Sequence, residues 1–134
     1  MTAKKLRGAI IGAGYFAGFQ AAAWQRINDC EIVAVADPLP ERAHEFAARW
    51  RIAVVYGDAG ELLRADRPDF VYIVTRPDSH LALVGLAADW QAQVICQKPL
   101  AESWEDCLAL VELCRAAQVR LLIHENWRWQ PWYR

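Results

Sequence analysis

The sequence has 134 residues, a length that suits one domain able to bury most of the surface its unfolded chain exposes. Fifteen basic and sixteen acidic side chains give a formal net charge of −1, with no basic block, which argues against nucleic acid or an anionic membrane as partner. Residues 1–7 lack the apolar run of a secretory signal and no later stretch is long enough to span a bilayer, so we expect a cytoplasmic protein with a small-molecule partner.

Short apolar runs of strand length alternate with segments of helical period along the whole chain. In chain order we expect a strand at 6–11, a helix through Phe16 and Ile27, a strand at 31–36, a helix at 40–50, a strand at 54–56, a helix at 59–65, a strand at 70–74, a helix at 79–88, a strand at 94–96, a helix beginning after Ser103 and a strand at 120–123. This alternation predicts an α/β protein: a three-layer Rossmann fold whose six-stranded parallel sheet has the order 3-2-1-4-5-6, with helices on both faces.

Two of the predicted helices show apolar faces. On the first, helical spacing relates Phe16, Gln20, Ala23, Trp24 and Ile27. On the fifth, Ser103 and Asp106 resemble a capping box, and one face carries Trp104, Cys107, Leu108, Val111 and Cys114.

The turn after the first strand has the pattern of a nucleotide-binding loop. It reads Gly12-Ala13-Gly14-Tyr15-Phe16-Ala17, directly follows an apolar strand and opens a helix. Gly12 can make the tight turn, Gly14 lets the backbone approach a pyrophosphate, and Ala17 supplies the small residue that close packing of helix and strand requires. Glycines alone are weak support, because many turns between a strand and a helix need them.

An acidic residue at the end of the second strand supports the same site. Asp37 lies twenty residues beyond Ala17, where a carboxylate can accept hydrogen bonds from ribose hydroxyls. A 2′-phosphate would meet like charge there, so we expect NAD, while Arg42 softens that preference and keeps NADP as an alternative. Asp37 followed by Pro38 is also a common turn opener, and both roles are compatible.

Lys98 is the only lysine of the chain outside Lys4 and Lys5. It follows the fifth strand at its expected carboxyl end, the edge at which ligands of open α/β sheets bind. We interpret it as a proton donor to a carbonyl oxygen or as a fixed positive charge near nicotinamide, against the alternative of a solvated loop lysine.

The segment Thr75-Arg76-Pro77-Asp78-Ser79-His80 follows the fourth strand at the same edge, and Asp78 or Ser79 can cap the next helix. Thr75, Arg76, Pro77 and His80 are kept as cofactor-binding candidates. Because the helix dipole disfavours a charged ring at this end, we expect His80 to pack in neutral form against the loop rather than to do acid–base work.

The remaining chemistry-bearing residues do not indicate a further site. The cysteines Cys30, Cys96, Cys107 and Cys114 form no CxxC pair and are interpreted as reduced core residues. Neither His44 nor His124 has a ligand-like spacing to cysteine or carboxylate, so no metal is assigned.

Taken together, these motifs resemble the glucose-fructose oxidoreductase, inositol dehydrogenase and rhizopine-catabolism (Gfo/Idh/MocA) family. The resemblance covers essentially the whole chain, and its carriers are the Gly12-Ala13-Gly14 turn with Ala17, Ala36-Asp37-Pro38, Thr75 to His80, Cys96-Gln97-Lys98-Pro99 and Asn126-Trp127-Arg128. It implies that Lys98 lies near nicotinamide and substrate and that Tyr15, Phe16 and Gln97 belong to the cofactor site. In the family, Gln97 is usually glutamate and the place of Arg76 is often proline. Gln97 therefore removes a charge that would orient Lys98, and Arg76 is a candidate partner for a cofactor phosphate or a substrate carboxylate.

The resemblance also implies a division of the chain and a function. Residues 1–125 would form the dinucleotide-binding domain, and residues 126–134, rich in aromatic rings, would begin the crossing to a substrate domain absent from this chain. We therefore expect the full-length protein to be a dehydrogenase that transfers hydride between nicotinamide and a sugar, polyol or related metabolite. On that view this chain binds cofactor with little turnover, and a homo-oligomer stays open. The alternatives are a non-catalytic NAD(P)-sensing regulator of the same fold and an adenosylmethionine-dependent methyltransferase.

Overall fold

A computed structural model describes residues 4–133; residues 1–3, part of the stretch considered above for a secretory signal, and residue 134, the last of the predicted crossing segment, lie outside it. The strands are β1 (Leu6–Ile11), β2 (Cys30–Ala36), β3 (Val54–Tyr56), β4 (Phe70–Ile73), β5 (Gln93–Gln97) and β6 (Leu121–His124). The α-helices are α1 (Tyr15–Trp24), α2 (Pro40–Trp50), α3 (Ala59–Asp66), α4 (His80–Asp89) and α5 (Trp104–Ala116). Single 3-10 turns span Pro77–Ser79, Asn126–Trp129 and Pro131–Tyr133.

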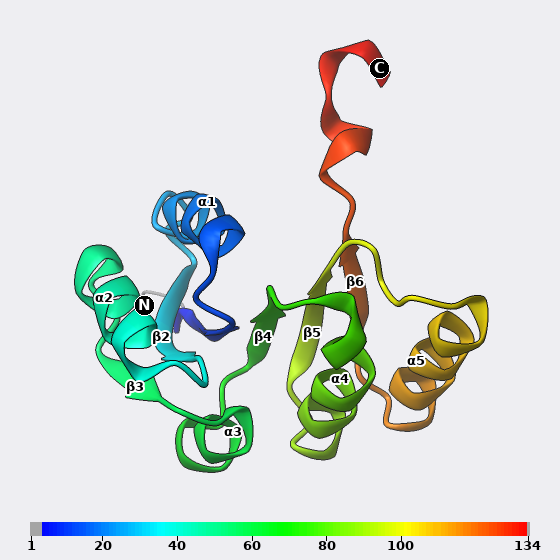
Figure 1. Ribbon diagram of the computed structural model, residues 1–134, viewed down its shortest axis with the longest axis horizontal. Helices are drawn as coiled ribbons and strands as arrows, with labels where there is room; N and C mark the ends of the chain where they lie inside the picture. Colours follow the sequence, from blue (N-terminus) through cyan, green and yellow to red (C-terminus); the bar gives the residue numbers. More distant parts are fainter. Residues whose placement is uncertain (1–3, 134) are drawn as a thin grey trace.

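The sheet confirms the predicted topology. Its six strands run parallel in the order β3-β2-β1-β4-β5-β6 (Figure 1). The chain leaves β1 toward β2 and β3, then returns to place β4 on the other side of β1. The connections after β1 and β4 therefore diverge, which opens a crevice at the carboxyl ends of these two strands.

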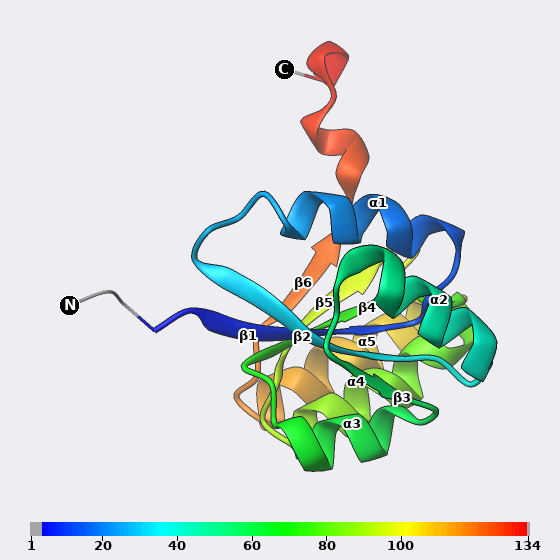
Figure 2. The ribbon, with the colours of Figure 1, turned by 90° about the vertical axis from the view of Figure 1, so that its left-hand side faces the viewer.

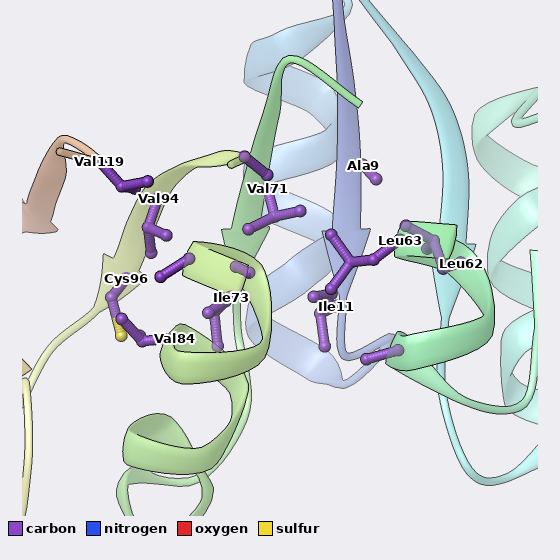
Figure 3. Close-up of a cluster of buried hydrophobic side chains, with 14 of the residues drawn as sticks. Ala9, Ile11, Leu62, Leu63, Val71, Ile73, Val84, Val94, Cys96 and Val119 are labelled. Carbon is purple, nitrogen blue, oxygen red and sulfur yellow. The ribbon is translucent and has the colours of Figure 1, made fainter. Parts of the chain in front are cut away.

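Helices cover both faces of the sheet, with α1 and α2 on one face and α3, α4 and α5 on the other (Figure 2). Along β1, Ile10 points to the α1 and α2 layer, whereas Ala9 and Ile11 point to the opposite layer. Figure 3 shows part of that second layer, where Leu62 and Leu63 of α3 lie against the sheet. Burial on both faces explains why the central strands are almost continuously apolar.

The buried face of α1 differs from the predicted one. The helix ends at Trp24, and it buries Ala17 and Ala21, whereas Phe16 and Ile27 are exposed. Alanines occupy the buried face because a short side chain lets the helix backbone come close to the sheet. Of the residues that helical spacing relates on this helix, Trp24 packs partly buried against the core.

The buried face of α5 agrees in part with the predicted one. Cys114 is buried and Cys107 packs partly buried against the core, as predicted, whereas Trp104, Leu108 and Val111 are exposed. Leu110, which lies outside the predicted face, is buried as well. Apolar residues surround most of this helix, so spacing alone did not separate the two stripes. Its start is as predicted: the hydroxyl of Ser103 accepts a hydrogen bond from the Asp106 amide at 3.0 Å.

The last described segment extends away from the sheet (Figure 1). Its two 3-10 turns expose the aromatic side chains of Trp127, Trp129, Trp132 and Tyr133, each by more than half. The rings that were expected to pack against a further domain therefore lie on the surface of the described chain.

Close packing at Gly8 gives a stability prediction. A Cβ atom at Gly8 would lie 2.2 Å from the ring of Phe70, which itself packs on Trp24. We expect Gly8→Ala to lower the free energy of unfolding by about 1–3 kcal/mol, as overpacked cores do, measured by urea denaturation. Gly57→Ala is the matched control, because nothing lies within 4 Å of its added Cβ. Equal stability of the two variants would contradict the packing described here.

Candidate functional site

A cavity of about 750 Å³ lies where the carboxyl ends of β1, β2, β4 and β5 meet the following loops. This volume is in the range of small-molecule sites. The predicted site residues that line it are Gly12, Gly14, Tyr15, Phe16, Asp37, Arg42, Thr75, Arg76, Gln97 and Lys98. Three other predicted residues, Ala17, Pro77 and His80, are not part of its lining.

Gly12 makes the tight turn out of β1. Its φ of +100° is in the region that favours glycine, and a Cβ there would lie 2.5 Å from the carbonyl oxygen of Val74. Its amide donates to the carbonyl of Ala36 at 2.8 Å, which ties the turn to the end of β2. Gly12 is therefore required by the backbone itself, before any ligand is considered.

Gly14 has a different role. It precedes α1 in extended conformation, no side chain caps the helix there, and nothing lies within 4 Å of a Cβ built on it. Open space at the amino end of a helix lets an anion approach the free amides and the positive end of the helix dipole. Ala17, one turn later, is fully buried and packs against the sheet, as a small residue in that position should.

Asp37 is at the centre of the hydrogen-bond network beside the cavity, and its side chain is 1% exposed. One carboxylate oxygen accepts from the Ala13 amide at 2.8 Å and from Nε of Arg42 at 3.0 Å. The other accepts from the Leu39 amide at 2.9 Å and from a terminal nitrogen of Arg42 at 2.7 Å. The carboxylate thus joins the glycine turn, the β2–α2 turn and α2.

These contacts decide the charge of Asp37. Burial works to raise the pKa of this carboxyl, but the hydrogen bonds from Arg42, Ala13 and Leu39 and the positive charge of Arg42 outweigh it, so the pKa lies below its ordinary value. Asp37 is therefore ionised at neutral pH. Arg42 is partly exposed and lines the cavity beside Asp37.

Lys98 follows β5 and faces the cavity from the side opposite Asp37. Its Nζ lies 5.9 Å from the centre of the Phe16 ring, within the range of a cation–π contact. The side chain of the preceding Gln97 is buried and accepts a hydrogen bond from the backbone amide of Lys98 at 2.8 Å. Gln97 thus shapes the turn, whose Lys98–Pro99 peptide bond is cis, while an aromatic ring holds the ammonium group.

The turn after β4 supplies the floor between these two sides. The hydroxyls of Thr75 and Ser79 lie 2.7 Å apart, and Ser79 also donates to the carbonyl of Arg76 at 2.8 Å. The guanidinium of Arg76 is 86% exposed and forms a 3.4 Å ion pair with Asp78. Arg76 therefore lies at the cavity as a solvent-exposed cation.

Sequence reasoning missed part of the lining. Gly57 and Asp58, directly after β3, line the cavity, as do Leu83 and Leu86 of α4. The first pair was predictable, because the loop after β3 lies at the same edge of the sheet. The leucines lie on a nearly uniformly apolar helix and gave no such signal.

The cysteines and possible metal ligands add no second centre. All four cysteines are free, and burial raises the pKa of the Cys96 thiol to about 12, so this thiol is not a ready nucleophile. Among residues 4–133, no three His, Cys, Asp or Glu side chains gather as a metal site would need. In the same residues no helix is long and apolar enough to cross a membrane.

The lowered pKa of Asp37 gives a pH prediction. A carboxylate whose folded pKa lies below its unfolded value of about 3.9 stabilises the fold above that pH and loses this contribution as the pH falls through the folded pKa. We expect Asp37→Asn to lower the free energy of unfolding by about 1–2 kcal/mol at pH 7, because an amide replaces the charged acceptor. The difference from the unaltered protein should shrink below about pH 4. Urea denaturation across this range measures it, and a difference that stayed constant down to acid pH would contradict the assignment.

Comparison with known proteins places this geometry in a family. Residues 6–125 match the Gfo/Idh/MocA family, described as an oxidoreductase family with an NAD-binding Rossmann fold. D-apiose dehydrogenases of Paraburkholderia graminis and Rhizobium rhizogenes are 43% and 42% identical over 97% of this chain, which spans 35% and 38% of their lengths. The crystal structure of an oxidoreductase from Agrobacterium radiobacter, in complex with NAD+, L-tartaric acid and magnesium, superposes with a TM-score of 0.92 at 42% identity, over 95% of this chain and 37% of that one.

The match bears on the alternatives as well. It contradicts the hypothesis of an adenosylmethionine-dependent methyltransferase. None of these relatives is described as a regulator. With the glycine turn, the acid after β2 and the lysine after β5 on one cavity, the chain belongs to the Gfo/Idh/MocA oxidoreductase family and corresponds to its NAD-binding Rossmann domain.

Proposed function

We propose that this chain is the cofactor-binding part of an NAD-dependent dehydrogenase that acts on a CH–OH group of a sugar, with D-apiose as the first substrate to test. The observation that carries the proposal is that Gly14, Asp37 and Lys98 border one cavity at the switch point of the sheet. The similarity to D-apiose dehydrogenases supports the choice of substrate.

The cavity fits a dinucleotide in three places. The open space beside Gly14, at the amino end of α1, suits the pyrophosphate. Asp37 and Arg42 suit the adenosine ribose, and the turn at Thr75 together with Lys98 suits the nicotinamide end. The aromatic and aliphatic lining, including Phe16, suits the flat rings of such a ligand.

The choice between NAD and NADP depends on the pair formed by Asp37 and Arg42. A 2′-phosphate would approach a buried, ionised carboxylate, which favours NAD. Arg42 already occupies both oxygens of Asp37, so a ribose hydroxyl must share or displace the guanidinium. Arg42 would therefore cover the ribose site in the absence of cofactor. NADP remains the weaker ligand in this proposal.

Lys98 supplies the acid–base group of the proposed site. When bound, nicotinamide supplies the hydride donor or acceptor of the reaction. Lys98 holds a proton at Nζ, directed by the Phe16 ring, for a substrate oxygen that enters above the cavity. Gln97 fixes the backbone of this turn without adding a negative charge.

The rest of the active site is proposed to lie beyond this chain. Residues 1–125 would bind the cofactor, and residues 126–134 would begin the crossing to an α/β substrate domain, in keeping with the greater length of the relatives. Exposed rings such as Trp127 and Trp132 would pack against that domain or a second copy in a homo-oligomer. The free cysteines suit a reducing compartment, and we place the protein in the cytoplasm.

Cofactor binding is testable on this chain directly. A methyl group at Gly14 would occupy the space proposed for the pyrophosphate without touching the protein, so we expect Gly14→Ala to weaken NAD binding at least about tenfold, or about 1.4 kcal/mol, at unchanged thermal stability. Gly18→Ala on the same helix is the control, because its added Cβ meets only Trp50, at 3.8 Å. Quenching of tryptophan fluorescence by NAD, with NADP in parallel, measures both. Equal affinity of the two variants, or tighter binding of NADP, would contradict the proposed fit.

A kinetic test of Lys98 requires the proposed longer protein, in which this chain is joined to a substrate-binding part. We expect Lys98→Met to lower kcat for NAD-dependent oxidation of D-apiose by about 10²–10⁴-fold, the usual contribution of a general acid or base. The Kd for NAD should change little. Lys5→Met, at an exposed residue before β1, is the control. Full turnover in the Lys98 variant would remove the lysine from the mechanism, whereas failure of D-apiose alone would change only the substrate.

A further inference from the structure

His80 is a fully buried polar residue at the start of α4 that the proposed chemistry leaves unused. Its ring has a backbone carbonyl oxygen near each nitrogen: Nδ1 lies 3.0 Å from the oxygen of Leu100, and Nε2 lies 3.2 Å from the oxygen of Thr75. Neither partner is a side chain, so the ring links stretches of backbone.

The two carbonyls belong to two different turns beside the cavity. Thr75 follows β4 and lines the cavity floor, whereas Leu100 lies two residues after Lys98 in the turn that follows β5. His80 therefore joins the segment proposed to meet the nicotinamide with the segment that carries the lysine. The side-chain hydrogen bonds of Thr75, Ser79 and Gln97 each stay within one of these turns and do not join the two.

The number of ring hydrogens decides how many of these two contacts are hydrogen bonds. A carbonyl oxygen only accepts, so each contact requires a hydrogen on the facing nitrogen. A ring with hydrogens on both nitrogens makes both bonds, and a neutral ring makes one. The contact to Leu100 is the shorter of the two and bears directly on the turn of Lys98.

We propose that His80 is a positioning residue for Lys98: by donating from Nδ1 to the carbonyl of Leu100, it holds the lysine-bearing turn in place so that Nζ stays over the Phe16 ring and faces the cavity. This inference rests on the proposed function for the meaning of Lys98. The held geometry itself is a property of the chain without cofactor.

Two substitutions separate the two contacts. The amide nitrogen of asparagine can take the place of Nδ1, and that of glutamine can take the place of Nε2. His80→Asn therefore keeps a donor for Leu100, whereas His80→Gln keeps one for Thr75. Both variants bury an amide at the same position, so a purely structural role would make them behave alike. His44→Asn, at an exposed position of α2, is the control.

The small number of lysines provides the readout. The chain has only Lys4, Lys5 and Lys98, so reductive methylation with ¹³C-formaldehyde gives few NMR signals beside that of the terminal amine, and Lys98→Arg assigns the signal of Lys98. The Phe16 ring should shift the Lys98 methyl signal upfield of the two exposed lysines, and Phe16→Leu should remove that shift. We expect His80→Asn to keep the shifted signal and His80→Gln to move it toward the signals of Lys4 and Lys5.

The outcomes are distinct. Equal signals in the Asn and Gln variants would overturn the proposal. A second measurement needs no variant: the ¹⁵N spectrum of the histidine rings in the unaltered chain should show a hydrogen on Nδ1 of His80 that exchanges slowly, and a bare Nδ1 would also overturn it. An NAD titration on the same samples judges the proposed function separately, because a chain that does not bind NAD still reports the position of Lys98.

Discussion

The carboxylate of Asp37 is the constraint on which the site depends. It lies almost completely out of water and is kept ionised by two backbone amides and a bidentate guanidinium. A buried charge is tolerable only when its lone pairs are filled, and here each donor comes from a segment that must be placed correctly. The Ala13 amide fixes the glycine turn, the Leu39 amide fixes the chain after β2, and Arg42 orients the first turns of α2. One acid thereby organises the side of the cavity that we propose for the adenosine ribose, before any ligand arrives.

The sheet supplies the second half of the arrangement. Because β4 returns beside β1, the turns after β1, β4 and β5 meet at one edge although they are distant in sequence. Gly12 makes this meeting tight, since its missing side chain lets the β1 turn touch the carbonyl of Val74 at the end of β4. At this edge the Lys98 amide donates to the side chain of Gln97, and the Nζ of Lys98 lies 5.9 Å from the centre of the Phe16 ring. Fold and site thus share the same few backbone positions.

The sequence predicted the strand order and ten of the 22 residues that line the cavity, because alternation of apolar runs and the residues at strand ends are local signals. It failed where a choice depended on neighbours in space. Helical spacing did not select Ala17 and Ala21 of α1 or Leu110 of α5, which are buried, although it did select the buried Cys114. His80 was expected to pack against its own loop, and it does contact Thr75, but its shorter contact is to Leu100, twenty residues away. No local sequence pattern predicts a contact between residues so far apart in the chain.

The aromatic support of Lys98 has a consequence for the electrostatics of the cavity. A carboxylate that oriented the ammonium group would also cancel its charge, whereas a ring attracts the cation through its quadrupole and leaves the charge intact. Within residues 4–133, no acidic side chain forms an ion pair with Lys98, and the neighbouring position holds the neutral Gln97. The cavity therefore keeps one undiminished positive charge at the end remote from Asp37. An electron-rich oxygen entering from solution would be attracted toward the Lys98 end, where we propose that the reaction occurs, and dissolved salt would weaken that attraction.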